Sequence, residues 1–198
     1  MSVNENSITM RSIPTLNTLR LILRPFELAD GPRVQTLAGA WEIANTTATM
    51  PHPYPDGVAE QWIAGHAEGF AKGNNLPLAV CLQDGTLIGC VSLMGFRTSH
   101  SRGELGYWIG KDYWGKGYCT EAARELVRFG FAELALNRIF GQHMSRNPAS
   151  GRVMQKIGMK HEGCLRQHLS RWGKLEDLEH YGLLRCEWLA AQACGMRT

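Results

Sequence analysis

A pair of glycines directly before an apolar helix pattern is the feature that most constrains this chain. The segment DYWGKGYCTEAARELVRFGF, residues 112–131, places Gly115 and Gly117 just before apolar residues that recur at helical spacing. The start of such a helix attracts phosphate, because its unpaired N–H donors and its dipole both favour negative charge. A plain glycine turn into a core helix is the alternative, and the loop alone does not separate the two.

Two well-known phosphate motifs do not fit this loop. A P-loop reads G-x-x-x-x-G-K-[ST], whereas Lys116 lies between the glycines and no Ser or Thr follows a G-K pair. The dinucleotide fingerprint G-x-G-x-x-G fails as well, because Thr120 stands where the third glycine belongs. A nucleotide hydrolase and a nicotinamide enzyme are therefore the weaker interpretations.

The hydrophobic patterns predict an α+β domain in which a mixed sheet carries helices on its faces. Asp84-Gly85 between two apolar runs predicts a hairpin. Asn147 and Pro148 predict the cap and first residue of a short helix. We expect strands over 18–26, the hairpin 76–96, 103–110 and 137–144, a hairpin over 161–190 that turns at 172–174, and helices over 27–39, 56–73, 119–134 and 147–159; residues 41–55 read as irregular.

Composition narrows the class of protein. The 198 residues suit one domain, and their net charge of +3 is interspersed, which does not argue for a nucleic-acid partner. The first residues lack a secretory pattern and no apolar run approaches the roughly 20 residues of a membrane span, so we expect a soluble cytoplasmic protein with no membrane partner. The six cysteines form no C-x-x-C pair, which predicts free thiols and no metal site.

The context of the glycine loop carries a family resemblance. The stretch GELGYWIGKDYWGKGYCTEAARELVRFGF, followed by NRIFGQHMSRNPASGRVMQKIGMKHEG, resembles the GCN5-related N-acetyltransferases (GNAT), most of all the branch of ribosomal-protein N-terminal acetyltransferases. The resemblance implies a GNAT fold with a mostly antiparallel sheet of about seven strands and about four helices. It also implies acetyl-CoA as co-substrate, one N-acetyltransferase domain over 18–190, an N-terminal extension over 1–17 and a tail over 191–198.

The same resemblance implies which residues hold the cofactor. In the family a Q/R-x-x-G-x-G/A loop binds the pyrophosphate; here Trp114 replaces Gln/Arg, as is common in this branch, and Gly117 and Cys119 occupy the last two fixed positions. The strand before the loop carries a bulge in the family, and its backbone pairs with pantetheine like an added strand. The implied cofactor-binding residues are Tyr107, Trp108, Ile109, Trp114, Gly115, Lys116, Gly117, Tyr118, Cys119, Thr120, Asn147 and Ser150.

Two residues are candidates for the chemistry. A free amine is mostly protonated at neutral pH, so a base must remove a proton before attack. Glu104, on the strand beside the cofactor, fits that role through water. Its alternatives are a solvated carboxylate or a partner for Arg102. Ser150 is the candidate donor to the departing thiolate, although serine is common in a first helical turn for capping reasons. A nucleophilic Cys119 is the weaker alternative, because no histidine is nearby in sequence to activate it.

The acceptor is not readable from the sequence. Trp41, Pro51, Pro53, Tyr54 and Trp172 lie in segments that flank the acceptor cleft in this fold, and they fit either an acceptor site or core lids. A protein N-terminus and a small amine both remain open as acceptors, as do a monomer and a homodimer. The alternative from another functional class is a non-catalytic acyl-CoA-binding sensor on the same fold.

Overall fold

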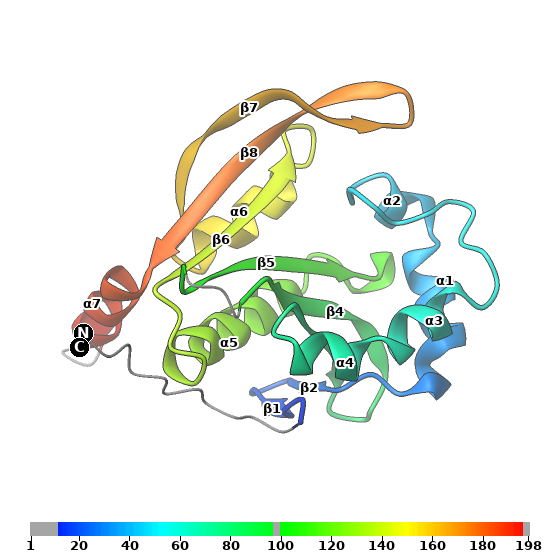
Figure 1. The fold of residues 1–198 in the computed structure, drawn as a ribbon, viewed down its shortest axis with the longest axis horizontal. Coiled ribbons are helices and arrows are strands. Elements are labelled where there is room, and N and C mark those ends of the chain that lie inside the picture. Colours follow the sequence, from blue (N-terminus) through cyan, green and yellow to red (C-terminus); the bar gives the residue numbers. More distant parts are fainter. Residues whose placement is uncertain (1–11, 97–99, 196–198) are drawn as a thin grey trace.

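One eight-stranded sheet organises the protein. The computed structural model describes residues 12–96 and 100–195, and the strands lie in the order β1-β2-β3-β4-β5-β6-β8-β7 (Figure 1). The strands are β1 Leu16–Asn17, β2 Leu21–Arg24, β3 Asn75–Leu82, β4 Leu87–Met94, β5 Arg102–Ile109, β6 Arg138–Met144, β7 Lys160–Arg171 and β8 Lys174–Leu184. The α-helices are α1 Gly31–Ala38, α2 Trp41–Ala44, α3 Val58–Ala64, α4 His66–Ala71, α5 Tyr118–Ala132, α6 Pro148–Lys156 and α7 Arg185–Gly195.

The sheet is antiparallel except at its centre. Strands β5 and β6 run parallel and pair through Arg102, Gly103 and Glu104, opposite Arg138, Ile139 and Phe140. Beyond these residues the two strands diverge, which Figure 1 shows as the widening gap between them. The crossover between them is α5, as a parallel pair requires. The gap opens at the carboxyl end of β5, beside the glycine loop.

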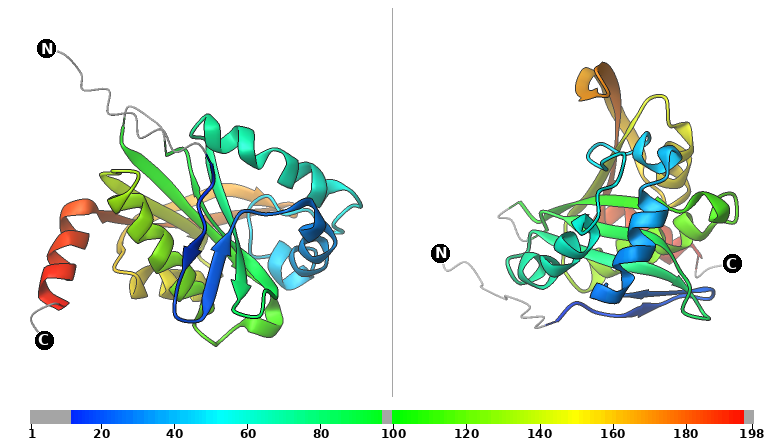
Figure 2. Two further views of the ribbon diagram at one scale, coloured as in Figure 1. Left: turned by 90° about the horizontal axis from the view of Figure 1, so that it is seen from below. Right: turned by 90° about the vertical axis from the view of Figure 1, so that its right-hand side faces the viewer.

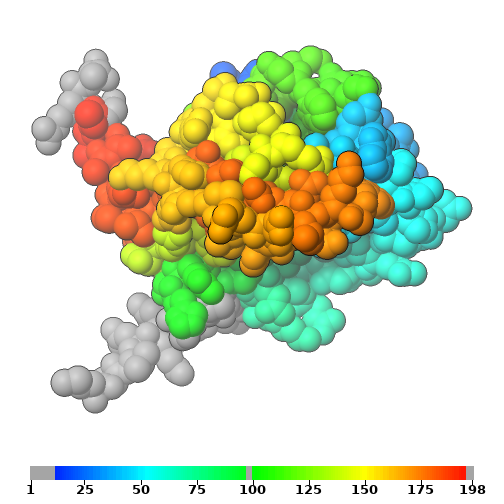
Figure 3. All heavy atoms as spheres, turned by 90° about the horizontal axis from the view of Figure 1, so that it is seen from above, coloured from blue at the N-terminus to red at the C-terminus, as the bar shows by residue number. Residues whose placement is uncertain are grey.

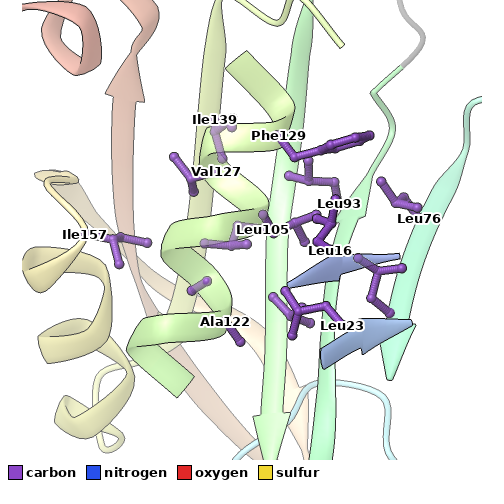
Figure 4. Packing of buried hydrophobic residues seen from close by; sticks show 14 of the residues in the cluster. Leu16, Leu23, Leu76, Leu93, Leu105, Ala122, Val127, Phe129, Ile139 and Ile157 are labelled. Carbon is purple, nitrogen blue, oxygen red and sulfur yellow. The ribbon is translucent and has the colours of Figure 1, made fainter. Parts of the chain in front are cut away.

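The two faces of the sheet carry separate cores. Alternate residues of β3 illustrate this: Leu76 and Leu78 join the larger cluster with α5, whereas Ala79 and Cys81 join a smaller cluster with α1 and α3. The alternation follows from the period of two along a strand. Figure 4 shows the larger cluster between α5 and the sheet, and Figure 2 shows α5 and the helices α1 to α4 on their respective sides. The alternation shifts by one residue at the start of β4, where Ile88 joins the larger cluster and Leu87 the smaller one.

Helix α5 follows the expected pattern closely. Gly117 is its N-cap with φ +81°, a left-handed conformation that favours glycine. The face that packs on the sheet is fully buried at Ala123, Leu126 and Phe131. Because burying such apolar side chains stabilises by about 1.5–3 kcal/mol each, packing of this face fixes the position of the helix start.

Several element boundaries differ from expectation. The helix expected over 56–73 is two helices, since α3 ends at Ala64 and α4 begins at His66, with Gly65 between them. Residues 41–44, expected to be irregular, form α2. The strand expected to continue to 190 gives way to α7, where Glu187 accepts a hydrogen bond from the N–H of Leu184 and Trp188 packs on Phe131.

The strand expected over 18–26 is shorter, as β2, and it pairs with β1, which was not expected. The other strands and helices lie close to their expected ranges, and Gly85 at the turn between β3 and β4 has φ +86°. Among the described residues no helix is both long enough and apolar enough to cross a membrane.

Candidate active site

One cavity of about 900 Å³ runs through the gap between β5 and β6 to both faces of the sheet. One end, here called the α5 half, is lined by Tyr107, Ile109, residues 113–115 and 117–120, and the inner side of α6. The other end, the α3 half, is lined by residues of α1 to α3, the segment 46–51, and the side of β3 to β5 that faces these helices. Glu104 and Ser150 therefore border one continuous space.

The glycine loop forms the outer edge of the α5 half. Gly115 and Gly117 both have left-handed φ angles, +75° and +81°, and both line the cavity. A Cβ on Gly117 would lie 3.4 Å from the guanidinium of Arg20. The Lys116 side chain folds back to donate to the carbonyl of Asp112 at 3.0 Å and does not line the cavity. Of the seven loop residues expected at the cofactor, Lys116 is thus the one whose side chain points elsewhere.

Arg20 holds this loop from a distant part of the sequence. Its guanidinium donates to the carbonyl of Lys116 at 3.0 Å and forms an ion pair with Glu121 at 2.6 Å. Glu121 also accepts the hydroxyl of Thr18 at 2.7 Å. Burial alone would raise the pKa of Glu121, but the hydrogen bonds from Thr18 and Arg20 outweigh it and lower that pKa. The first turn of α5 is fixed by contacts that no local sequence motif predicts.

The strand before the loop differs from expectation in one respect. The resemblance implies a bulge in β5, yet β4 and β5 pair in unbroken register from Gly89–Ile109 to Met94–Glu104. The divergence of β6 is what separates the backbone of β5 from its neighbour here. The carbonyl of Ile109 accepts the indole N–H of Trp114 at 2.5 Å. Trp114 thereby ties the loop to the end of the strand.

Glu104 faces the α3 half. In the sheet register it lies beside Met94, which in turn lies beside Asn75, so the three side chains share one face. Its carboxylate accepts a hydrogen bond from Gln142 of β6 at 3.0 Å. Arg102, the alternative partner for Glu104, instead lies over the ring of Phe140. The carboxylate is therefore held across the gap between β5 and β6.

Tyr107 faces the opposite side, toward α6. Its hydroxyl donates to the carbonyl of Ser150 at 2.9 Å and lies 3.0 Å from the Ser150 hydroxyl. The tyrosine has one proton for these two partners, and either hydroxyl can be the donor of the second bond. Burial raises the pKa of Tyr107, so the phenol stays protonated. The sequence assigned only backbone contacts to Tyr107, and its side-chain bond to Ser150 was missed.

Two further polar residues line the α5 half near Ser150. Asn147 is the N-cap of α6, as expected, but its side chain makes no capping bond. His143 is only 8% exposed and donates from Nδ1 to the carbonyl of Met144 at 2.9 Å, which leaves Nε2 as an unpartnered acceptor. The ring packs against Gly151, where a Cβ would lie 2.6 Å from Nε2. His143 carried no motif in the sequence.

The electrostatics of the α5 half favour an anion. Arg152 and Lys156 of α6 line it together with the N-terminus of α5. Cys119 lines the same region, and burial raises the pKa of its thiol to about 12. A nucleophilic cysteine requires the opposite shift, because the thiolate is the reactive form.

Residues 41–51 form a cover, here called the roof, over the α3 half, and side chains of Arg146 and the β7–β8 hairpin hold it. The guanidinium of Arg171, near the tip of the β7–β8 hairpin, donates to the carbonyls of Ala44 and Met50, and that of Arg146 donates to the carbonyl of Asn45 at 2.6 Å. Trp172 at the tip packs on Trp41 of α2 with ring centroids 5.4 Å apart. Figure 3 shows the hairpin lying against the α2 region.

The five residues expected around an acceptor cleft lie in three different places. Pro51 and Tyr54 line the cavity, whereas Trp41 and Trp172 form the outer contact of the roof and Pro53 lies in a separate surface groove.

Comparison with known proteins decides the family. A model of the acetyltransferase (GNAT) domain matches residues 20–160. The chain belongs to the GNAT acetyltransferase family. This acetyltransferase is 33% identical over 177 residues to "Putative ribosomal N-acetyltransferase YdaF" of Bacillus subtilis (strain 168), with 85% of this chain and 93% of that protein covered.

Solved structures agree with the fold of this acetyltransferase. A crystal structure of a probable acetyltransferase matches with TM-score 0.79 and 30% identity over 88% of this chain and 99% of the other. A spermidine N-acetyltransferase from Vibrio cholerae, in complex with CoA and spermine, matches with TM-score 0.76 and 20% identity over 87% and 99%. The GNAT fold is confirmed, with eight strands and seven α-helices in the described residues instead of about seven and four.

Proposed function

We propose that this acetyltransferase moves the acetyl group from acetyl-CoA directly to a primary amine held in the α3 half of the cavity. One observation carries the proposal: Glu104 and the Tyr107–Ser150 pair project from opposite faces of β5 into the same gap. Removing a proton from the attacking amine and stabilising the leaving sulfur require groups on opposite sides of the thioester carbon. The alternation of one strand supplies that separation.

The α5 half would hold the cofactor. Gly115, Gly117 and the N-terminus of α5, with Arg152 and Lys156, suit the phosphates of CoA. The β5 backbone at Tyr107 and Trp108, no longer paired with β6, suits the amides of pantetheine. Asn147, whose side chain is not used as a cap, would contact the same arm.

The chemistry follows from these positions. Glu104 takes one proton from the bound ammonium group, directly or through water, and the neutral amine then attacks the thioester carbon and forms the C–N bond. A backbone N–H of β5 would stabilise the oxyanion. The C–S bond then breaks, and the sulfur takes a proton from the Ser150 hydroxyl, which takes in return the second proton that the nitrogen loses as it becomes an amide. The proton on Glu104 finally returns to solvent.

The test combines binding with turnover. We expect calorimetry to show selective binding of acetyl-CoA over ATP–Mg²⁺ and NAD⁺, and we expect a thiol reagent to detect CoA release when an amine is added. Binding of ATP in preference to acetyl-CoA would overturn the cofactor assignment. Acetyl-CoA binding with no amine-dependent thiol release from any acceptor would favour the sensor.

A further inference from the structure

The α3 half carries a charge and polarity pattern that selects among amines. Of the described residues that line the whole cavity, Glu104 is the one carboxylate. A polyamine would therefore bring a second ammonium group to a wall with no second acid, and burying an unpaired charge is costly. The pattern fits an acceptor with a single positive charge.

The wall around Glu104 is mostly apolar. Met94 lies next to it in the register, and Trp62 of α3 and Met50 of the roof segment line the same half. The hydroxyls of Thr46 and Thr47 donate to carbonyls of their own helical segment at 3.0–3.3 Å. These two residues therefore contribute methyl groups to the cavity wall. The body of an acceptor in this space would be in contact with carbon.

Thr49, Ser92 and Gln142 also line this half, but among its described residues Asn75 alone has a buried side-chain atom without a hydrogen-bond partner. The side-chain oxygen of Asn75 is buried and has no hydrogen-bond partner, and Asn75 lines the cavity on the same face as Glu104. An unsatisfied buried acceptor is destabilising unless a ligand supplies a donor. Asn75 and Glu104 lie on strands separated by β4, so roughly 10 Å divides their backbones at the ordinary strand spacing.

We propose that the acceptor is a small monoamine with an apolar body, whose ammonium end lies at Glu104 and whose far end donates a hydrogen bond to Asn75. This inference rests on the proposed acetyl transfer and names its substrate class. The roof that Arg146 and Arg171 hold over the α3 half favours a small molecule over a protein terminus.

The test is a panel of acceptors on the full-length protein with acetyl-CoA. Tyramine and 2-phenylethylamine form a matched pair that differs in the distal hydroxyl donor, putrescine and spermidine carry additional charges, and a short peptide presents an α-amine. We expect kcat/KM for tyramine to exceed that for 2-phenylethylamine about three- to tenfold. We expect both to exceed the two polyamines by at least about tenfold, because the second ammonium group has no partner.

Two variants locate the effect at Asn75. Asn75→Leu has nearly the same shape without the acceptor, and we expect it to bring the ratio of tyramine to 2-phenylethylamine to about one. Asn75→Asp adds a second carboxylate on the same face, and we expect the ratio of putrescine to 2-phenylethylamine to rise at least about fivefold, since a charged hydrogen bond is stronger than a neutral one.

Several results would overturn the inference: a polyamine or the peptide as the best acceptor, a tyramine ratio that is unchanged in Asn75→Leu, or acetyl-CoA binding without transfer to any arylalkylamine. The wild-type panel decides the substrate class even where a variant does not fold. Absence of acetyl-CoA binding by calorimetry would instead overturn the proposed function, so the two failures are distinguishable.

Discussion

The two halves of the cavity are built in different ways. Most of the α5 half comes from two short stretches, residues 105–120 and 143–156. The α3 half gathers single residues from α1, α2, the segment after it, α3, β3, β4 and β5. A site made from short stretches can be recognised as a motif, whereas a site assembled by the tertiary fold leaves no local pattern.

The halves also differ in chemistry. The α5 half offers backbone donors, a helix N-terminus and two cations, which suit one ligand with phosphates. The α3 half offers mostly apolar side chains, with Glu104 as its carboxylate and Asn75 as its buried, unpartnered acceptor. Substitutions in the two halves should therefore affect different quantities among kcat, the KM of the acceptor and the affinity for acetyl-CoA. The following experiments test that separation.

The largest effect is expected from Glu104→Gln. Removing the proton acceptor should lower kcat about 100-fold or more, because general base catalysis typically contributes that much. The dissociation constant of acetyl-CoA, measured by calorimetry, should stay within about twofold. Gln142→Ala is the matched control: it removes the hydrogen bond to Glu104 and keeps the carboxylate, so its effect on kcat should be much smaller. Equal loss of binding and turnover in Glu104→Gln would contradict the assignment.

A second experiment separates Tyr107 from Ser150. We expect Ser150→Ala to lower kcat about 10- to 100-fold and Tyr107→Phe to lower it about tenfold, with acetyl-CoA binding retained. Because Tyr107 acts through the Ser150 hydroxyl, the double variant should be no slower than Ser150→Ala alone. Steady-state kinetics of the three variants measures this, and additive losses would show that Tyr107 acts independently.

Gly117→Ala should weaken acetyl-CoA binding about tenfold. A Cβ at φ +81° is strained by roughly 1–2 kcal/mol, and relief of that strain would tilt the loop away from its N–H geometry. Gly85→Ala is the control, because Gly85 has φ +86° in a hairpin far from the cavity. Both variants should lose similar thermal stability, while calorimetry should detect weaker acetyl-CoA binding in Gly117→Ala alone.

The smallest effect is expected at the roof. Arg171→Gln loses donors to Ala44 and Met50, so the KM of the acceptor should rise about three- to fivefold while acetyl-CoA binding stays constant. Arg166→Gln, on the exposed part of the same strand, should leave both values near wild type. A change in acetyl-CoA affinity in Arg171→Gln would show that the two halves are coupled.

The sequence predicted what is local and missed what is distant. The start of α5 and the first turn of α6 were placed within one or two residues, because glycine, proline and the helical period act over a few positions. Arg20 was missed because its contact with Lys116 spans 96 residues. The break at Gly65 was missed because the apolar pattern continues through it.

The candidate site shows the same limit. Glu104 and Ser150 were named from a motif, and the structure brings both to one cavity while their roles stay proposals. The Tyr107 hydroxyl, His143 and Asn75 were not named, because their significance depends on which face of a strand meets which helix. Period-two alternation predicts that two residues differ in face, but only the packed fold shows what each face meets.

The arginine contacts to the roof have a consequence for how this enzyme diversifies. Arg146 and Arg171 grip carbonyl oxygens of residues 44, 45 and 50, and every amino acid carries that same oxygen. The attachment therefore depends on the backbone path of these residues and not on their side chains. Residues 48–51, which line the α3 half, can thus change by mutation without loss of these arginine contacts. Acceptor preference is free to drift across descendants while the scaffold and the acetyl donor stay the same.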